Sequence, residues 1–334
     1  MGAHVFIVND DTFPILRDKG LVAVFKEDET KSLAEKTKAD ILADLSCLRV
    51  GDKIFFYQLQ IGFHGIYEVV GIPFIDDNNI EGLENVPYRC KIRPKYYFKN
   101  PVSELRVFGL KDSAQKAHSI FYKKALQRGK ACTHLFPEEE KFLTELLIKA
   151  NDGISELVIT PYNPPSNISN IFFDLQTNEN DELKYEKILE GWLIQNIDKR
   201  EARTDIFLGN VEDIECFANY IPVNIAGGNI DIMVFHKKQI NGIEQRYKIS
   251  IIELKKGIIT DESIKEIERY IKWAYENITN NDIEVIQPVL IGKDIDKSAT
   301  ERCKYYALND RKPILIKYEV DAQNYSLRFN KVEY

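Results

Sequence analysis

The sequence predicts two domains, a β-rich N-terminal half and an α/β C-terminal half. At 334 residues the chain exceeds the usual size of a single domain. Short runs of β-branched and aromatic residues fill the first half, whereas helical spacing alternates with apolar strands in the second. Between them lies ITPYNPPSNISN, which has three prolines and is typical of a linker. We expect domains at 1–150 and 181–334, joined by a linker over 151–180.

In the first half, Gly, Pro and Asp-Asn turns separate the expected strands. These strands are HVFIV, LVAVF, KIFFYQL, GIYEVVGI, YRCKI and LRVFGL. Helices are expected for SLAEKTKADILADL, SAQKAHSIFYKKALQRG and EEEKFLTELLIKAN. Pro137 before three glutamates marks the start of the last one.

In the second half, NDELKYEKILEGWLIQNI has apolar residues at helical spacing, which predicts a helix with one buried stripe. Strands are expected for NIDIMVFH and YKISIIELK, followed by the helix DESIKEIERYIKWAYENI. Three further strands are expected for VIQPVLIG, ILIKYEV and YSLRFNKV. This order predicts an α/β core.

Composition indicates an ordinary globular protein, with 44% hydrophobic and 29% charged residues. No apolar run approaches the roughly 18 residues that span a bilayer, and the start of the chain lacks the pattern of a signal peptide. We therefore expect a cytoplasmic protein without a membrane partner. The five cysteines are scattered singly, without a C-x-x-C pair, and are expected to be small buried hydrophobic residues.

Charge is distributed unevenly along the chain. The net charge is −7, yet residues 88–130 hold twelve Lys or Arg and two acids, whereas residues after 150 hold 31 acids and 23 bases. Aromatic residues are interleaved with the basic ones, and this mixture suits phosphates and unpaired bases. The alternative is that the rings are core and the charges solvated. The candidate DNA contacts are Arg89, Lys91, Arg93, Lys95, Lys99, Lys123 and Lys124.

Three charged residues interrupt apolar strands in the second half. Asp231 lies within NIDIMVFH, and Glu253 and Lys255 lie two residues apart in IIELK, so both project from one strand face. Burying such charges is costly unless a partner or a metal offsets the cost. Carboxylate oxygens are the ligands that Mg²⁺ prefers, and metal-assisted phosphodiester cleavage needs such a site.

The strings GGNIDIMV, IIELKKG and EIERYI together resemble the PD-(D/E)XK nuclease superfamily over about residues 181 to 300. The similarity is to endonucleases of the NucS kind and their restriction relatives. It implies that Asp231, Glu253 and the carbonyl of Leu254 bind Mg²⁺, with Mn²⁺ as a substitute, and that Lys255 orients the attacking water.

The resemblance extends to two helices. On the helix after IIELK, relatives often carry Gln-x-x-x-Tyr, and here Glu266 and Tyr270 occupy those positions. The tyrosine fits the pattern and the glutamate departs from it. Relatives also use a glutamate on the preceding helix, for which Glu186 and Glu190 are both candidates because they lie one turn apart.

The first half resembles, more loosely, the PUA-like β-barrels called EVE domains, over about residues 3 to 145. The similar strings are HVFIVND, LSCLRVGDKIFFYQLQ and GIYEVVGIPF, and the matching positions are Gly51, Asp52, Phe56, Tyr57 and Gly65. The resemblance implies a barrel with flanking helices that encloses a flipped, modified base. This half has no tryptophan for the pocket wall, so Tyr57, Phe25 and His64 are the candidates, with core positions as the alternative.

We therefore expect a Mg²⁺-dependent endodeoxyribonuclease. In this interpretation the first domain recognises modified cytosine in double-stranded DNA and the second cuts, as in restriction of modified phage DNA, with a homodimer for double-strand cleavage. One alternative is a repair or structure-selective nuclease. Another is a non-catalytic nucleic-acid-binding module that keeps the nuclease fold as a scaffold.

Overall fold

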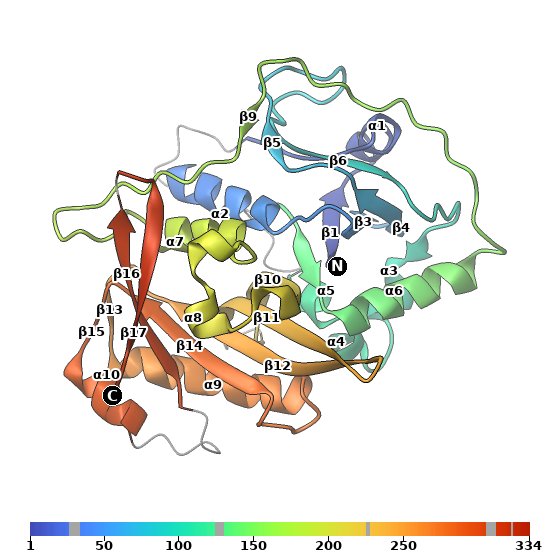
Figure 1. Cartoon of the computed structure of the whole chain (residues 1–334). Coiled ribbons are helices and arrows are strands. Elements are labelled where there is room, and N and C mark those ends of the chain that lie inside the picture. Colours follow the sequence, from blue (N-terminus) through green and yellow to red (C-terminus); the bar gives the residue numbers. More distant parts are fainter. Residues whose placement is uncertain (27–33, 124–129, 225–227, 305–311, 322) are drawn as a thin grey trace. The chain divides into compact units, whose positions relative to one another are not determined.

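The computed structural model describes residues 1–26, 34–123, 130–224, 228–304, 312–321 and 323–334 (Figure 1). The structure is mixed α/β with several sheets. It divides into two compact units, Met1–Phe172 and Phe173–Tyr334. None of the helices in the described ranges combines the length and apolar character that a membrane crossing requires.

The first unit contains the β-rich pattern that its sequence predicts. Its strands are β1 (Ala3–Val8), β2 (Leu21–Val24), β3 (Lys53–Gln58), β4 (Gly62–Val69), β5 (Phe74–Ile75), β6 (Tyr88–Pro94), β7 (Val102–Ser103), β8 (Thr133–Leu135) and β9 (Ser169–Asn170). Its helices are α1 (Thr12–Lys19), α2 (Ala34–Ser46), α3 (Glu104–Phe108), α4 (Ser113–Lys116), α5 (His118–Lys123) and α6 (Pro137–Ala150).

The strands of this unit pair in the order β8-β1-β3-β4-β6-β5-β9, with β2 added to β6 and β7 added to β4. β1 runs parallel to β3 and antiparallel to β8. One face packs Tyr57, Phe63 and Leu147 into a common hydrophobic core. Over the described residues the pairing does not close into a barrel, which differs from the barrel that the sequence resemblance implied.

Two expectations for the first unit are wrong. LRVFGL was expected to be a strand, but most of it forms α3, because the side chain of Ser103 caps the helix by accepting a hydrogen bond from the Arg106 amide at 3.4 Å. The helix expected over 113–129 is interrupted at Ala117, between α4 and α5. Residues 124–129 of that helix lie outside the described ranges.

Part of the expected linker packs against the first unit. The amide of Thr160 donates to the carbonyl of Asp18 at 2.8 Å, and the Tyr162 hydroxyl donates to Asp76 at 2.6 Å. Ser169 and Asn170 form β9, which pairs with β5. These hydrogen bonds satisfy backbone and side-chain groups that a free linker would leave to water.

The second unit alternates helices and strands. Its helices are α7 (Glu186–Asn196), α8 (Asp205–Leu208), α9 (Asp261–Asn277) and α10 (Lys297–Lys304), with 3-10 turns η1 (Arg200–Ala202) and η2 (Val211–Asp213). Its strands are β10 (Ile214–Pro222), β11 (Asn229–Ile240), β12 (Ile243–Leu254), β13 (Ile258–Ile259), β14 (Ile286–Gly292), β15 (Asp294–Ile295), β16 (Ile314–Asp321) and β17 (Ser326–Val332).

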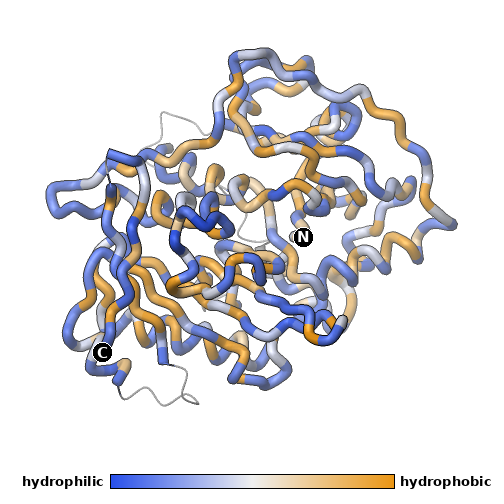
Figure 2. The backbone as a smooth tube through the Cα atoms, in the orientation of Figure 1, coloured by the Kyte–Doolittle hydropathy of each residue, from blue (hydrophilic) through white to orange (hydrophobic). Residues whose placement is uncertain are grey.

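Six of these strands form a mixed sheet in the order β10-β11-β12-β14-β16-β17. β10, β11 and β12 are antiparallel, whereas β12, β14 and β16 are parallel. Every residue from 249 to 254 on β12 is buried, which is typical of a strand covered on both faces, and both α7 and α9 contact it. Figure 2 shows the hydrophobic run along these central strands.

Local sequence fixes the ends of the elements around β12. Asn241 and Gly242 join β11 to β12 with positive φ angles of 52° and 81°, which is the conformation that a two-residue hairpin turn favours. Thr260 precedes α9, and its amide donates to the Ser263 hydroxyl at 3.3 Å. A tight turn therefore fixes the start of β12, and a cap fixes the start of α9.

Helix α7 approaches Phe173 through a glycine. A Cβ added at Gly191 would lie 2.1 Å from the Phe173 ring, which is itself buried. We expect Gly191→Ala to lower the free energy of unfolding by about 1–3 kcal/mol, because the clash must be relieved by shifting packed groups. Chemical denaturation measures this change.

The matched test uses Phe173→Ala, which removes the ring. In that background Gly191→Ala should be neutral or stabilising, since alanine favours a helix by roughly 0.5–1 kcal/mol over glycine. If Gly191→Ala stabilises the chain that keeps Phe173, then α7 does not pack as described.

Candidate functional site

Two carboxylates meet where β11 and β12 pair. The register joins Ile232 with Ile252, so Asp231 and Glu253 are the next residues along the two strands. The amide of Leu254 donates to Asp231 Oδ2 at 2.8 Å, which confirms that the two strand ends are adjacent. The strand pairing therefore brings together the two carboxylates that the sequence singled out.

The protein interior disfavours the charge on both groups. Glu253 is 3% exposed, and its Oε2 atom has no hydrogen-bond partner among the described residues. Burial raises the pKa of Glu253, and the neighbouring Asp231 raises it further. Burial also raises the pKa of Asp231, followed by repulsion from Glu190. The buried Glu253 and the half-buried Asp231, both with raised pKa values, provide oxygen atoms that a cation could stabilise.

Lys255 faces this pair from the end of β12. Its Nζ lies 2.5 Å from Glu253 Oε1 and 3.1 Å from Glu266 Oε2 on α9. Burial lowers the pKa of Lys255, but the carboxylates around it outweigh burial and leave that pKa raised, so the side chain is a cation. The Tyr270 hydroxyl donates to Glu266 Oε1 at 3.0 Å, so Glu266 links the lysine to the tyrosine.

Helix α7 brings both candidate glutamates toward the carboxylates. Glu190 is 1% exposed and its charge acts on Asp231, whereas Glu186 accepts a hydrogen bond from the Lys256 amide at 3.2 Å. Burial raises the pKa of Glu186, and Lys255 partly offsets this increase. Glu190 therefore has the larger electrostatic effect on Asp231, and Glu186 lies beside the segment that follows β12.

Two further residues hold Glu190 and were not anticipated from the sequence. Asn219 Nδ2 donates to Glu190 Oε1 at 2.8 Å, and Lys187 Nζ forms an ion pair with Glu190 Oε2. Asn219 is fully buried within the apolar strand β10. A lone amide in the apolar run CFANYI is the sequence signal that could have identified it, because buried amides need hydrogen-bond partners.

The donor set suits a hard divalent cation. Asp231 and Glu253 supply carboxylate oxygens, and magnesium typically uses one or two carboxylates and keeps several waters. Glu253 Oε2, which is unpartnered in the part of the chain that the structure describes, is the atom whose burial such an ion would stabilise. The residues therefore fit the Mg²⁺ site that the family resemblance implied, with the Leu254 carbonyl as the remaining candidate ligand.

The basic residues of the first unit occupy different environments. Arg89 is buried, and its guanidinium pairs with Asp76 at 2.7 Å and contacts the Tyr162 hydroxyl, which differs from the expected phosphate contact. Arg93 and Lys95 both pair with Glu68 on β4. Among the other candidates Lys91 is half-buried and Lys99 is exposed, while Lys124 and the side chain of Lys123 lie outside the described part of the chain.

The three aromatic candidates for a base pocket do not share one surface. Tyr57 is fully buried and stacks on Phe63 with ring centroids 4.6 Å apart. His64 is hydrogen-bonded to Gln58 at 2.8 Å, and burial lowers its pKa to about 4. Neighbours along a strand face opposite sides, and β3 and β4 align Tyr57 with Phe63 but Phe56 with His64. The expected pocket of Tyr57, Phe25 and His64 is therefore not assembled, and Phe25 is 55% exposed.

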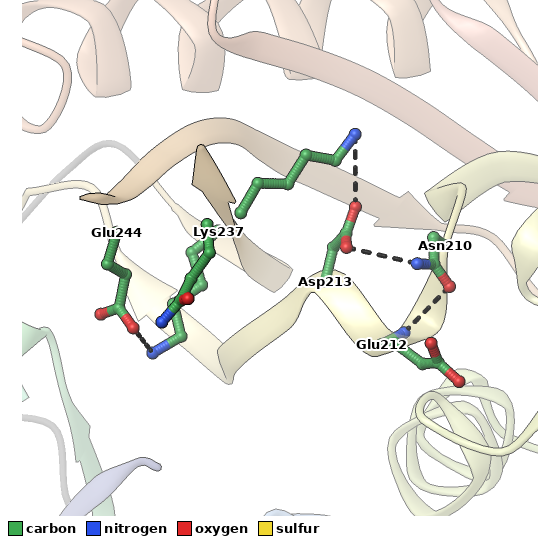
Figure 3. Close-up of a pocket in the computed structure, with 7 residues that line it drawn as sticks. Asn210, Glu212, Asp213, Lys237 and Glu244 are labelled. Carbon is green, nitrogen blue, oxygen red and sulfur yellow. Dashed lines mark hydrogen bonds and ion pairs between the residues drawn. The ribbon is translucent and has the colours of Figure 1, made fainter. Parts of the chain in front are cut away.

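A polar pocket in the second unit has a volume of about 490 Å³ (Figure 3). Its walls pair their own charges, since Lys237 lies 2.9 Å from Glu244 and Lys238 lies 3.5 Å from Asp213. None of the predicted site residues lines it. The lining residues are Asn210, Glu212, Asp213, Lys237, Lys238, Gln239 and Glu244.

Comparisons with known proteins give distant similarities. No family model and no curated protein matches the chain. Human THYN1 in complex with 5-methylcytosine-containing DNA is 11% identical, with a TM-score of 0.30, over 44% of this chain and 98% of that one. A repair endonuclease from Pyrococcus abyssi is 18% identical, with a TM-score of 0.24, over 36% of this chain and 47% of that one. An EndoMS–dsDNA complex is 15% identical, with a TM-score of 0.21, over 32% of this chain and 41% of that one. These similarities are partial, and this chain spans about half or less of the two endonucleases.

Proposed function

We propose that the protein is a Mg²⁺-dependent endonuclease that hydrolyses DNA phosphodiester bonds at Asp231, Glu253 and Lys255. The observation that carries the proposal is the buried Glu253 carboxylate oxygen beside Asp231, which has no hydrogen-bond partner within the described ranges, with a cationic lysine on the same strand end. A purely structural site would gain stability from apolar residues in these positions, because buried charges are costly.

Each residue has a distinct role in this proposal. Asp231, Glu253 and the Leu254 carbonyl hold the ion, while Glu190 or Glu186 completes the acidic surroundings. When bound, Mg²⁺ supplies an acidified water and neutralises charge on the phosphate. Lys255 orients the nucleophilic water and stabilises developing negative charge, and Glu266 with Tyr270 keeps its ammonium group aimed at Glu253.

The substrate is proposed to be double-stranded DNA with modified cytosine, cut as part of the restriction of phage DNA. This finer part rests on the resemblance of residues 3 to 145 to EVE domains. The exposed basic residues near β6 would contact phosphates, and contacts to a flipped base would select the site. A repair or structure-selective nuclease is the alternative that shares the same catalytic residues. Two copies of the chain would be needed to cut both strands.

The first prediction separates ion binding from catalysis. In the presence of a chelator, Asp231→Asn should raise the free energy of unfolding by about 1–2 kcal/mol, because it removes the repulsion between the two carboxylates and keeps an oxygen acceptor for the Leu254 amide. Glu253→Gln removes the same repulsion but also loses the ion pair with Lys255, so its gain should be smaller. Added Mg²⁺ should stabilise the wild-type chain and should stabilise these variants much less. Thermal unfolding with and without Mg²⁺ measures both effects.

Glu244→Gln is the matched control, because it removes one exposed carboxylate from a different part of the second unit. Its response to Mg²⁺ should equal that of the wild-type chain. Equal Mg²⁺ stabilisation of the Glu253→Gln variant would contradict the proposed ligand set.

The second prediction concerns the lysine. Lys255→Ala should reduce Mg²⁺-dependent cleavage of duplex DNA by about 100-fold or more, since it removes the positive group at the reacting phosphate, while DNA affinity changes little. Lys265→Ala is the control, because Lys265 lies on α9 but pairs with Asp261 and Glu262. Plasmid nicking rates and binding constants are the measurements.

Cleavage by the Lys255→Ala variant at the wild-type rate would remove Lys255 from the mechanism. A wild-type chain that binds DNA tightly and cuts no duplex would instead favour the non-catalytic binding module.

The third prediction concerns the base. The Asp231→Asn variant is used so that the DNA is not cut. It should bind a duplex with 5-methylcytosine or one with 5-hydroxymethylcytosine about 10-fold more tightly than the same duplex without modification, since one added group in a fitted pocket typically changes affinity by that order. Fluorescence anisotropy measures the three affinities. Equal binding to all three duplexes, with tighter binding to mismatched or flapped DNA, would replace restriction by the structure-selective alternative.

A further inference from the structure

A second cluster of ligand-type side chains lies in the first unit. His4 is on β1, His134 is on β8, and Cys132 directly precedes β8. The antiparallel pairing of β1 with β8 sets His4 opposite His134, and all three side chains are buried, with exposures of 1%, 4% and 4%. No candidate residue for DNA binding or cleavage belongs to this cluster.

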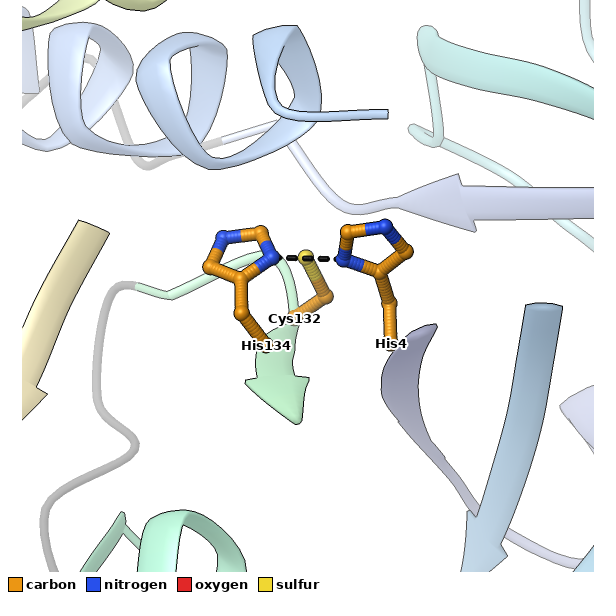
Figure 4. A group of neighbouring side chains, drawn as sticks. All are labelled: His4, Cys132 and His134. Carbon is orange, nitrogen blue, oxygen red and sulfur yellow. Dashed lines mark hydrogen bonds between the residues drawn. The ribbon is translucent and has the colours of Figure 1, made fainter. Parts of the chain in front are cut away.

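The three side chains converge on one point (Figure 4). The Nδ1 atoms of His4 and His134 lie 2.5 Å apart, and the two rings are nearly perpendicular at 88°. The ligand atoms of both histidines and of Cys132 all lie within 4.8 Å of one another. A hydrogen bond between two histidines does not need a thiol nearby, so the presence of Cys132 is what makes this cluster a candidate metal site.

An aspartate orients one of the histidines. Asp52 Oδ2 lies 2.9 Å from His4 Nε2, and Asp52 also accepts hydrogen bonds from the amides of Gly2 at 2.6 Å and Arg49 at 2.9 Å. An ionised carboxylate only accepts hydrogen bonds, so His4 Nε2 donates, and in the neutral imidazole the lone pair is then on Nδ1, facing the cluster. Metal-binding histidines almost always donate their other ring N–H to such a group.

We propose that His4, Cys132 and His134 bind a transition-metal ion of the Zn²⁺ type, with Asp52 orienting His4. Two imidazoles and one thiolate form a donor set that favours zinc over magnesium. Three protein ligands leave a fourth position, which water or another small donor would complete. Two nitrogen ligands of a tetrahedral ion lie about 3.3 Å apart, so the rings need to separate by less than about 1 Å.

The experiment uses Co²⁺ as a spectroscopic substitute for Zn²⁺. Because the cluster is buried, the full chain is expressed in cobalt-supplemented minimal medium so that the ion enters during folding. The purified, reduced protein should carry about one cobalt ion per chain in a site with thiolate-to-cobalt charge-transfer absorption. A site made of carboxylates, as around Asp231, cannot produce that absorption.

Two variants assign the absorption to this cluster. Cys132→Ser should abolish it, whereas Cys90→Ser, which changes a buried cysteine of the same unit outside the cluster, should keep it. Asp52→Asn should keep the absorption but weaken metal affinity by about 10–100-fold in competition with a chelator.

The proposal is overturned by a wild-type chain without charge-transfer absorption, a result that needs no variant to fold. It is also overturned if the absorption survives Cys132→Ser. Either result would mean that His4 and His134 form only a histidine–histidine hydrogen bond.

Discussion

The pairing of β11 with β12 sets two carboxylates side by side at the end of an apolar hairpin, where Glu253 is buried and Asp231 is half-buried. Several elements of the second unit contact these carboxylates or the strand that carries Glu253. The Leu254 amide donates to Asp231, Lys255 pairs with Glu253, and α7 and α9 cover the strand that carries both residues. The cost of keeping these charges buried is the strongest physical reason to associate the site with a cation and with chemistry.

The lysine at this site is shared. Lys255 divides its contacts between Glu253 and Glu266, and Glu266 in turn accepts from Tyr270. A glutamine at position 266 could occupy the same place without a negative charge. The glutamate therefore lowers the net positive potential around the Lys255 ammonium group and ties the lysine more firmly to α9.

Much of this architecture could be predicted from the sequence, because long apolar strands and amphipathic helices carry clear periodicity. The strands that carry Asp231 and Glu253 and the helix expected over 261–278 are confirmed, and the helix expected over 180–197 is confirmed from Glu186 onward. Predictions failed where local pattern and tertiary context disagree. LRVFGL has strand composition, yet the cap at Ser103 starts a helix. The candidates for the base pocket are not brought together, because sequence alone does not show which strand face each aromatic residue occupies.

Ion pairs and ligand clusters between residues that are distant in sequence could not be predicted from local patterns. The basic stretch from 88 to 130 contains two acids in sequence, but folding brings Glu68 to Arg93 and Lys95, and Asp76 to Arg89. Counting within a window misses such partners because they come from other strands. The histidine–cysteine cluster was missed for the same reason, since His4 is far along the chain from Cys132 and His134.

The pairing of β1 with β8 also constrains how the first unit folds. His4 and His134 are 130 residues apart, so β1 can pair parallel with β3 well before β8 has been synthesised. Until then the outer edge of β1 exposes unpaired backbone groups, which is the kind of strand edge that recruits other chains. Closing so long a loop is a late and entropically demanding step. The first unit is thus vulnerable to aggregation during synthesis at the same edge that buries His4 once folding is complete.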